Sequence, residues 1–136
     1  MGVLKSIIAS IFTGLILLGI DIVWLGIMTP RFYKPHLAAY MADKINFLPA
    51  ILFYVLFTLG LMLLVVFPAV ERGSLLRALL LGGLLGMVAY ATYDLTNLSS
   101  IKSWPLIVSV VDIVWGTFLS AISATLGYLI VKAFSR

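Results

Sequence analysis

Cysteine is absent from this chain of 136 residues, and both histidine and charged residues are scarce. Without cysteine the chain forms no disulfide, no thiolate metal site and no cysteine nucleophile. Its single histidine, His36, provides no histidine cluster, so we expect no metal site and no cofactor. Only 10% of the residues are charged, whereas soluble domains carry roughly 25%. The composition therefore excludes an ordinary soluble protein.

Apolar residues make up most of the chain, at 63%, with a mean hydropathy of +1.21. Four apolar runs cover residues 4–28, 47–67, 75–98 and 105–131. Each run is long enough to cross ~30 Å of hydrocarbon as a helix, and backbone groups in lipid must bond internally. We therefore predict an all-α integral membrane protein, with four transmembrane helices in a compact antiparallel bundle. The whole chain, 1–136, would form a single membrane domain.

Proline and charge separate these runs. We predict that Pro30 and Pro35 end the first span, because proline lacks an amide proton and clashes with the preceding turn. The connection over residues 30–46 is the longest, and its aromatic residues favour a short amphipathic segment along the interface. Trp104 beside Lys102 is typical of an interfacial anchor.

The net charge of +4 results from lysines and arginines at the ends of the spans. At such positions they meet lipid headgroups, so we expect the bilayer as a partner and no nucleic acid. With four spans, both termini lie on one side of the membrane. That side carries five of the nine lysines and arginines, which predicts cytoplasmic termini.

Three aspartates lie inside the apolar runs, where insertion of a carboxylate costs about 2.5–3.5 kcal/mol. Asp21 and Asp112 each open the tetrapeptide Asp-Ile-Val-Trp, and Asp94 lies near the end of the third run. Asp21 is seven residues before the end of its run and Asp112 seven residues after the start of its own. All three carboxylates are therefore predicted in the same half of the membrane, on the side of the long connection. So short a repeat does not establish an inverted duplication.

Helical spacing gathers small and polar residues on single faces. In the third run they are Gly82, Gly86, Tyr90, Tyr93 and Asn97, and in the fourth they are Ser109, Asp112, Gly116, Ser120, Ser123 and Gly127. Such stripes are typical of helix contacts in membranes, so we expect Gly82 and Gly86 at one. The interior is predicted where the first, third and fourth runs meet. The second run offers only Tyr54 and Thr58 as polar groups and would form an apolar wall.

A candidate site that binds a ligand or exchanges protons follows from these faces. Its residues are Asp21, Asp94, Asp112, Tyr90, Tyr93, Asn97, Trp24 and Trp115. Carboxylates flanked by aromatic rings suit a small cationic or amphipathic ligand. No lysine or arginine lies in a span core, so we expect Asp21 or Asp112 to hold a proton near neutral pH.

Structural interpretations of the same residues stay open. The aspartates would act as glue by accepting hydrogen bonds from Tyr90, Tyr93, Asn97 or Ser109. Asp94 would be an interfacial carboxylate that caps the following loop. Trp24 and Trp115 would belong to an aromatic belt at headgroup depth.

Three segments carry a family resemblance: Asp-Ile-Val-Trp-Leu-Gly at 21–26, Tyr-Ala-Thr-Tyr-Asp-Leu-Thr-Asn at 90–97 and Val-Val-Asp-Ile-Val-Trp-Gly at 110–116. With them the chain resembles, over nearly its whole length, the domain-of-unknown-function 2177 family of small bacterial membrane proteins. The resemblance implies a multi-pass protein of the bacterial inner membrane with four spans. It brings no established activity.

The residues favour a small transporter or binding protein for a small-molecule or lipid ligand, with proton coupling. A homodimer is expected, because four spans are few for a transporter. One alternative is a membrane-embedded enzyme that modifies lipids, with paired aspartates dividing acid and base roles. The chain has no nucleophile motif and no phosphate-binding arrangement, which argues against an enzyme. Another alternative is a structural or accessory subunit.

Overall fold

The computed structural model describes all 136 residues and confirms four helices long and apolar enough to cross a membrane. The first span comprises α1 (Val3–Met28), the π-helical turn η1 (Thr29–Tyr33), α2 (Lys34–Leu37) and the 3-10 turn η2 (Ala38–Tyr40). The second comprises α3 (Phe47–Leu61), the π-helical turn η3 (Met62–Val66) and α4 (Phe67–Glu71). The third is α5 (Leu75–Ser100) and the fourth is α6 (Leu106–Phe134).

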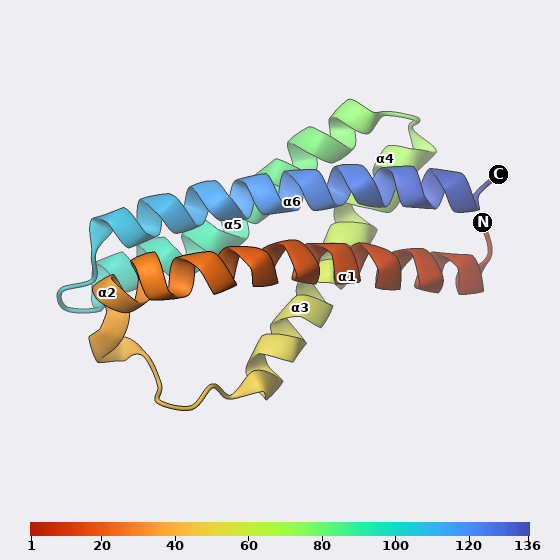
Figure 1. Cartoon of the computed structure of the whole chain (residues 1–136). Helices are drawn as coiled ribbons and strands as arrows, with labels where there is room; N and C mark the ends of the chain where they lie inside the picture. The colour runs from red at the N-terminus through yellow and green to blue at the C-terminus, as the bar shows by residue number, and fades with distance from the viewer.

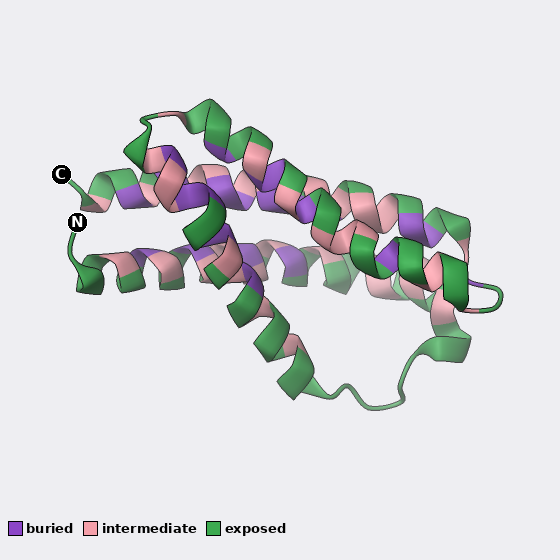
Figure 2. Ribbon diagram, turned by 180° about the vertical axis from the view of Figure 1, so that it is seen from behind, coloured by how far each residue is buried: buried purple, intermediate pink, exposed green.

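Helices α1, α5 and α6 form the body of the bundle, and α6 runs antiparallel to both of the others (Figure 1). The chain termini lie at the same end as the turn between α4 and α5. Helix α3 crosses the bundle obliquely, and its N-terminal half diverges from it and is mostly exposed (Figure 2). The all-helical antiparallel arrangement agrees with the prediction.

Glycines allow α5 and α6 to approach closely. Gly82 and Gly86 are both buried. A methyl group added to Gly82 would lie 2.5 Å from the Cβ of Ala124, and one added to Gly86 would overlap the Gly116 carbonyl oxygen. Gly116 in turn makes room for the ring of Tyr90. The predicted helix contact at Gly82 and Gly86 is therefore present, and it fixes the position of α5 against the site on α6.

The Gly86→Ala variant is expected to lower the free energy of unfolding by about 1–3 kcal/mol, as overpacking of a tight core does. The added methyl group meets backbone of α6, which cannot move aside as a flexible side chain can. Reversible unfolding in detergent micelles would measure the change. Gly60→Ala is the matched control, because a methyl group there has no neighbour within 4 Å. Equal stability of the two variants would contradict the close α5–α6 contact.

The first span does not end at Pro30, contrary to the prediction. The helix continues through η1, where the Lys34 amide donates to the carbonyl of Thr29, five residues earlier. A π-helical turn is wider than an α-helical turn and accommodates the proline, which has no amide proton to donate. The consequence is that Tyr33 lies on a helical extension of α1 and reaches α6, instead of lying in an interfacial loop.

Trp104 is also more enclosed than an interfacial anchor. Only 8% of its surface is exposed, and its indole N–H donates to Ser109 Oγ at 3.0 Å. Across from it, the Tyr40 hydroxyl donates to the carbonyl of Lys102. These contacts hold the end of the first span against the turn between α5 and α6, next to the carboxylates.

Candidate functional site

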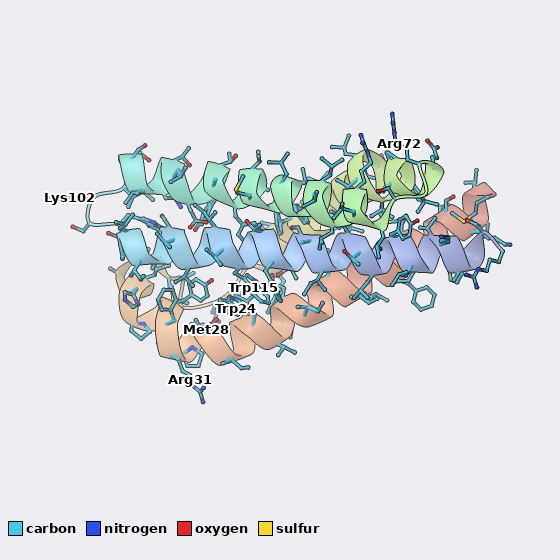
Figure 3. The ribbon with its side chains drawn as sticks, turned by 90° about the horizontal axis from the view of Figure 1, so that it is seen from above. Trp24, Met28, Arg31, Arg72, Lys102 and Trp115 are labelled. Carbon is cyan, nitrogen blue, oxygen red and sulfur yellow. The ribbon has the colours of Figure 1, made fainter.

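The two copies of Asp-Ile-Val-Trp face each other across the α1–α6 contact. The rings of Trp24 and Trp115 stack with their centroids 4.1 Å apart and an angle of 5° between their planes. Figure 3 shows both side chains between the two helices, on the side of Arg31 and Lys102. An aspartate and a tryptophan three residues later lie on the same face of a helix. Antiparallel packing therefore brings each tryptophan near the aspartate of the other copy.

Hydrogen bonds link the copies reciprocally. The indole N–H of Trp115 donates to Asp21 Oδ1 at 2.9 Å. In the other direction, the indole N–H of Trp24 donates to the Tyr33 hydroxyl at 3.1 Å, and that hydroxyl donates to Asp112 Oδ1 at 2.7 Å. One link is direct and the other passes through Tyr33. The two Asp-Ile-Val-Trp copies are therefore hydrogen-bonded to each other in the folded protein.

Asp21 is a fully bonded carboxylate. It is 5% exposed, and its two oxygens accept from Trp115 and from the hydroxyl of Tyr54 on α3. Asp21 therefore connects α1, α3 and α6. The second span was predicted to be a more apolar wall outside the interior, and this is wrong, because its Tyr54 supplies one of these donors.

Asp94 is the opposite case. It is fully buried, and neither of its carboxylate oxygens accepts a hydrogen bond. Its backbone carbonyl accepts from Ser109 Oγ at 2.8 Å, but its side chain does not. The interpretation of Asp94 as an interfacial carboxylate that caps the loop is wrong, because the side chain is enclosed between α5 and α6.

Asp94 faces the part of α6 that carries Asp112, because Ser109, which donates to the Asp94 carbonyl, lies three residues before Asp112 on the same face of that helix. Two ionised carboxylates have no donor between them, so the two side chains form a hydrogen bond only when one group holds a proton. Asp112 is half-buried, and Tyr33 is its donor, at Oδ1. The chain offers no hydrogen-bond donor to the remaining three oxygens of the pair.

No cation of the protein compensates these aspartates internally. All nine lysines and arginines are exposed, and Figure 3 shows Arg31, Arg72 and Lys102 at the periphery of the bundle. No group of three or more His, Asp or Glu side chains comes together as a metal site. The carboxylates depend on tyrosine and tryptophan donors alone.

The remaining sequence-predicted residues lie around this network without bonding the carboxylates. Tyr90 is half-buried over Gly116 and lies on the side of α5 that faces Asp21 and Asp112. Tyr93 is 56% exposed, near Asn97, with its ring edge-on to Trp104 at 6.0 Å. The expected glue donors Tyr90, Tyr93, Asn97 and Ser109 are thus not the ones that the carboxylate oxygens use.

Tyr33 and Tyr54 are the two donors that the sequence prediction missed. Tyr54 was one of the two polar residues of the second run, and an isolated tyrosine in an apolar span is itself a signal, because its buried hydroxyl needs a partner. Tyr33 gave no such signal, because its position depends on the helix continuing past Pro30.

Tyr33→Phe is expected to destabilise the fold by about 1–3 kcal/mol, because it leaves the indole N–H of Trp24 without an acceptor and removes the donor to Asp112. The near-ultraviolet circular dichroism of the stacked tryptophans should weaken in parallel. Tyr128→Phe is the control, since Tyr128 is a buried residue whose hydroxyl makes no hydrogen bond within the chain. An unchanged spectrum and unchanged stability in Tyr33→Phe would contradict the reciprocal link.

Comparison with curated proteins and with solved structures gives no match. A family model described as "Predicted membrane protein (DUF2177)" matches residues 6–129, which include both Asp-Ile-Val-Trp copies and Asp94. The family resemblance read from the three sequence segments is confirmed. With its four apolar helices and this match over nearly its whole length, the chain belongs to the DUF2177 family of membrane proteins.

Proposed function

We propose that this protein binds a small cationic ligand at the Asp94–Asp112 pair, in exchange for a proton, as a small transporter or binding protein of the bacterial inner membrane. The observation that carries the proposal is Asp94, which is fully buried with both carboxylate oxygens unbonded. An ionised carboxylate in such a place has lost its hydration and gained nothing in return. A positive species is needed beside it.

The neighbouring carboxyl group of Asp112 increases the need for a positive charge beside Asp94. Two unit charges ~4 Å apart repel by about 4 kcal/mol at an effective dielectric constant of ~20. The carboxyl groups of Asp94 and Asp112 lie next to each other, and every lysine and arginine is exposed. A shared proton removes the repulsion, and so does a bound cation. Since both would use the same oxygens, binding of the cation releases the proton.

The geometry supports different roles for the three aspartates. Asp21 has a donor on each oxygen and supports a structural role. Asp112 is half-buried and therefore more accessible than the fully enclosed Asp94. We therefore assign exchange to Asp94 and Asp112 and helix assembly to Asp21.

The orientation and the assembly are part of the same proposal. The end of the bundle that carries both termini and the α4–α5 turn also carries five of the nine lysines and arginines, which favours cytoplasmic termini. A homodimer is proposed for transport, because a four-helix chain leaves little room for a path of its own.

The test is proton release on addition of a cation. Purified protein in weakly buffered detergent at pH 7, with a pH-sensitive dye, is titrated with methylammonium, tetramethylammonium and sodium chlorides. Wild type is expected to acidify the solution with at least one of them, in a saturable way. Asp94→Asn and Asp112→Asn are expected to abolish the response, and the exposed-loop control Asp43→Asn to retain it. No saturable response in wild type would refute the proposed exchange.

A further inference from the structure

Three unbonded oxygens define which cation the carboxylate pair would accept. Oδ1 and Oδ2 of Asp94 accept no hydrogen bond, and Asp112 uses Oδ1 for Tyr33, which leaves its Oδ2. The three oxygens belong to carboxyl groups that the Ser109–Asp94 hydrogen bond brings to the same part of the α5–α6 contact. Asp94 is fully buried, so water does not cover its two oxygens as it would at a surface. The site thus offers acceptors and lacks donors.

The aromatic rings nearby do not form a cage for a quaternary ammonium ion. Cages of that kind hold the ion over open ring faces. Trp24 and Trp115 instead cover one face of each other at 4.1 Å, which leaves no space for an ion between them. Their N–H edges already donate to Tyr33 and Asp21.

A hard divalent metal ion fits the pair equally poorly. Ca²⁺ takes ~6–8 oxygen ligands and Mg²⁺ requires near-octahedral coordination. The pair provides three free oxygens, and no third carboxylate or histidine joins it as a metal-binding group. The chemistry that remains is a monovalent cation that brings its own hydrogen-bond donors.

We infer that the ligand of the Asp94–Asp112 pair is a small primary ammonium ion, whose three N–H groups donate to the three unbonded oxygens. A primary ammonium carries three donors and no acceptor, which is the complement of the site. The cation enters as the shared proton leaves, so the charge of the pair is unchanged. This inference rests on the proposed cation exchange and specifies its substrate class.

Selectivity then follows from counting donors. Each N–H that is replaced by a methyl group leaves one carboxylate oxygen without its donor, which is expected to weaken binding by about tenfold or more where that oxygen is one of the two buried ones of Asp94. Cation–π recognition would give the opposite order, with tetramethylammonium preferred. The two orders are opposite for ions of the same charge, so the series separates them.

The experiment titrates wild type with methyl-, dimethyl-, trimethyl- and tetramethylammonium chlorides at constant ionic strength, and measures proton release and its half-saturation concentration. We expect methylammonium to bind most tightly and affinity to fall at each step. Equal or tighter binding of tetramethylammonium, or of sodium, would overturn the ammonium inference and leave cation exchange standing. Absence of any saturable response would overturn both. A methylammonium response that persists in Asp94→Asn would also overturn the inference, since binding would then lie elsewhere.

Discussion

Asp94→Asn is expected to keep the protein folded and to remove the proton that we propose wild type holds between Asp94 and Asp112. The amide group has the shape of a carboxyl group and brings two N–H donors, so it donates to Asp112 without any added proton. We expect wild type to show the infrared band of a protonated carboxyl group at neutral pH, and Asp94→Asn to lack it. Its free energy of unfolding should stay within about 1 kcal/mol of wild type, because the amide N–H donates to Asp112 in place of the shared proton and no donor elsewhere in the chain loses its acceptor.

Asp43→Asn is the matched control for this change, because Asp43 is exposed in the loop before α3. The band should persist in that variant. Persistence of the band in Asp94→Asn would show that the proton belongs to another group. A large loss of stability in Asp94→Asn would show that the Asp94 carboxylate has a partner that it needs, which is contrary to the geometry.

The features that the sequence predicted correctly are those that lipid or local spacing imposes. Backbone groups in hydrocarbon must bond within their own helix, so four apolar runs become four helices. A glycine pair four residues apart marks a close contact whatever the partner, and Gly82 and Gly86 do pack on α6. The equal distance of Asp21 and Asp112 from the ends of their runs predicted that both lie at one depth, and the structure shows in addition that the two motifs contact each other.

The hydrogen-bond partners of the aspartates could not be predicted from the sequence, because they depend on how each helix is rotated about its own axis. In a soluble protein the apolar face fixes that rotation, but here lipid and interior are both apolar and the pattern is nearly uniform. Asp21 was therefore expected to bond to α5 or α6 residues such as Tyr90 or Ser109, and it bonds to Tyr54 and Trp115. The role of Tyr33 required a π-helical turn at Pro30, whereas proline read alone predicts the end of a helix.

The repeated tetrapeptide can be interpreted only from the packing of the helices that carry it. Four matching residues in two apolar helices do not establish a duplication. Packed antiparallel, the same residues form a stacked tryptophan pair with hydrogen bonds crossing in both directions. The two halves differ in one respect: Asp21 is saturated by direct donors, whereas Asp112 has one donor and an unbonded neighbour, Asp94. That asymmetry is the basis for our proposal that Asp21 serves helix assembly and that Asp94 and Asp112 serve exchange.

Asp21→Ala should therefore produce the largest loss of stability among the aspartate variants. It leaves the Tyr54 hydroxyl and the Trp115 indole N–H without acceptors in the interior, at about 1–3 kcal/mol for each, or about 2–6 kcal/mol together. Equilibrium unfolding in mixed micelles would measure it, with Asp43→Ala as the exposed control. Tyr54→Phe combined with Asp21→Ala should cost less than the sum of the two single changes, because both remove the same bond.

The fraction of Asp21→Ala that remains folded should still release a proton on addition of methylammonium, since the exchange pair is intact. This separates the two roles in one variant: stability falls and cation response survives, the reverse of Asp94→Asn. If Asp21→Ala were as stable as Asp43→Ala and had lost the response, Asp21 would belong to the binding site. The assignment of helix assembly to Asp21 and of exchange to Asp94 and Asp112 would then be wrong. Asp21 would bind the ligand even though both of its oxygens already accept hydrogen bonds.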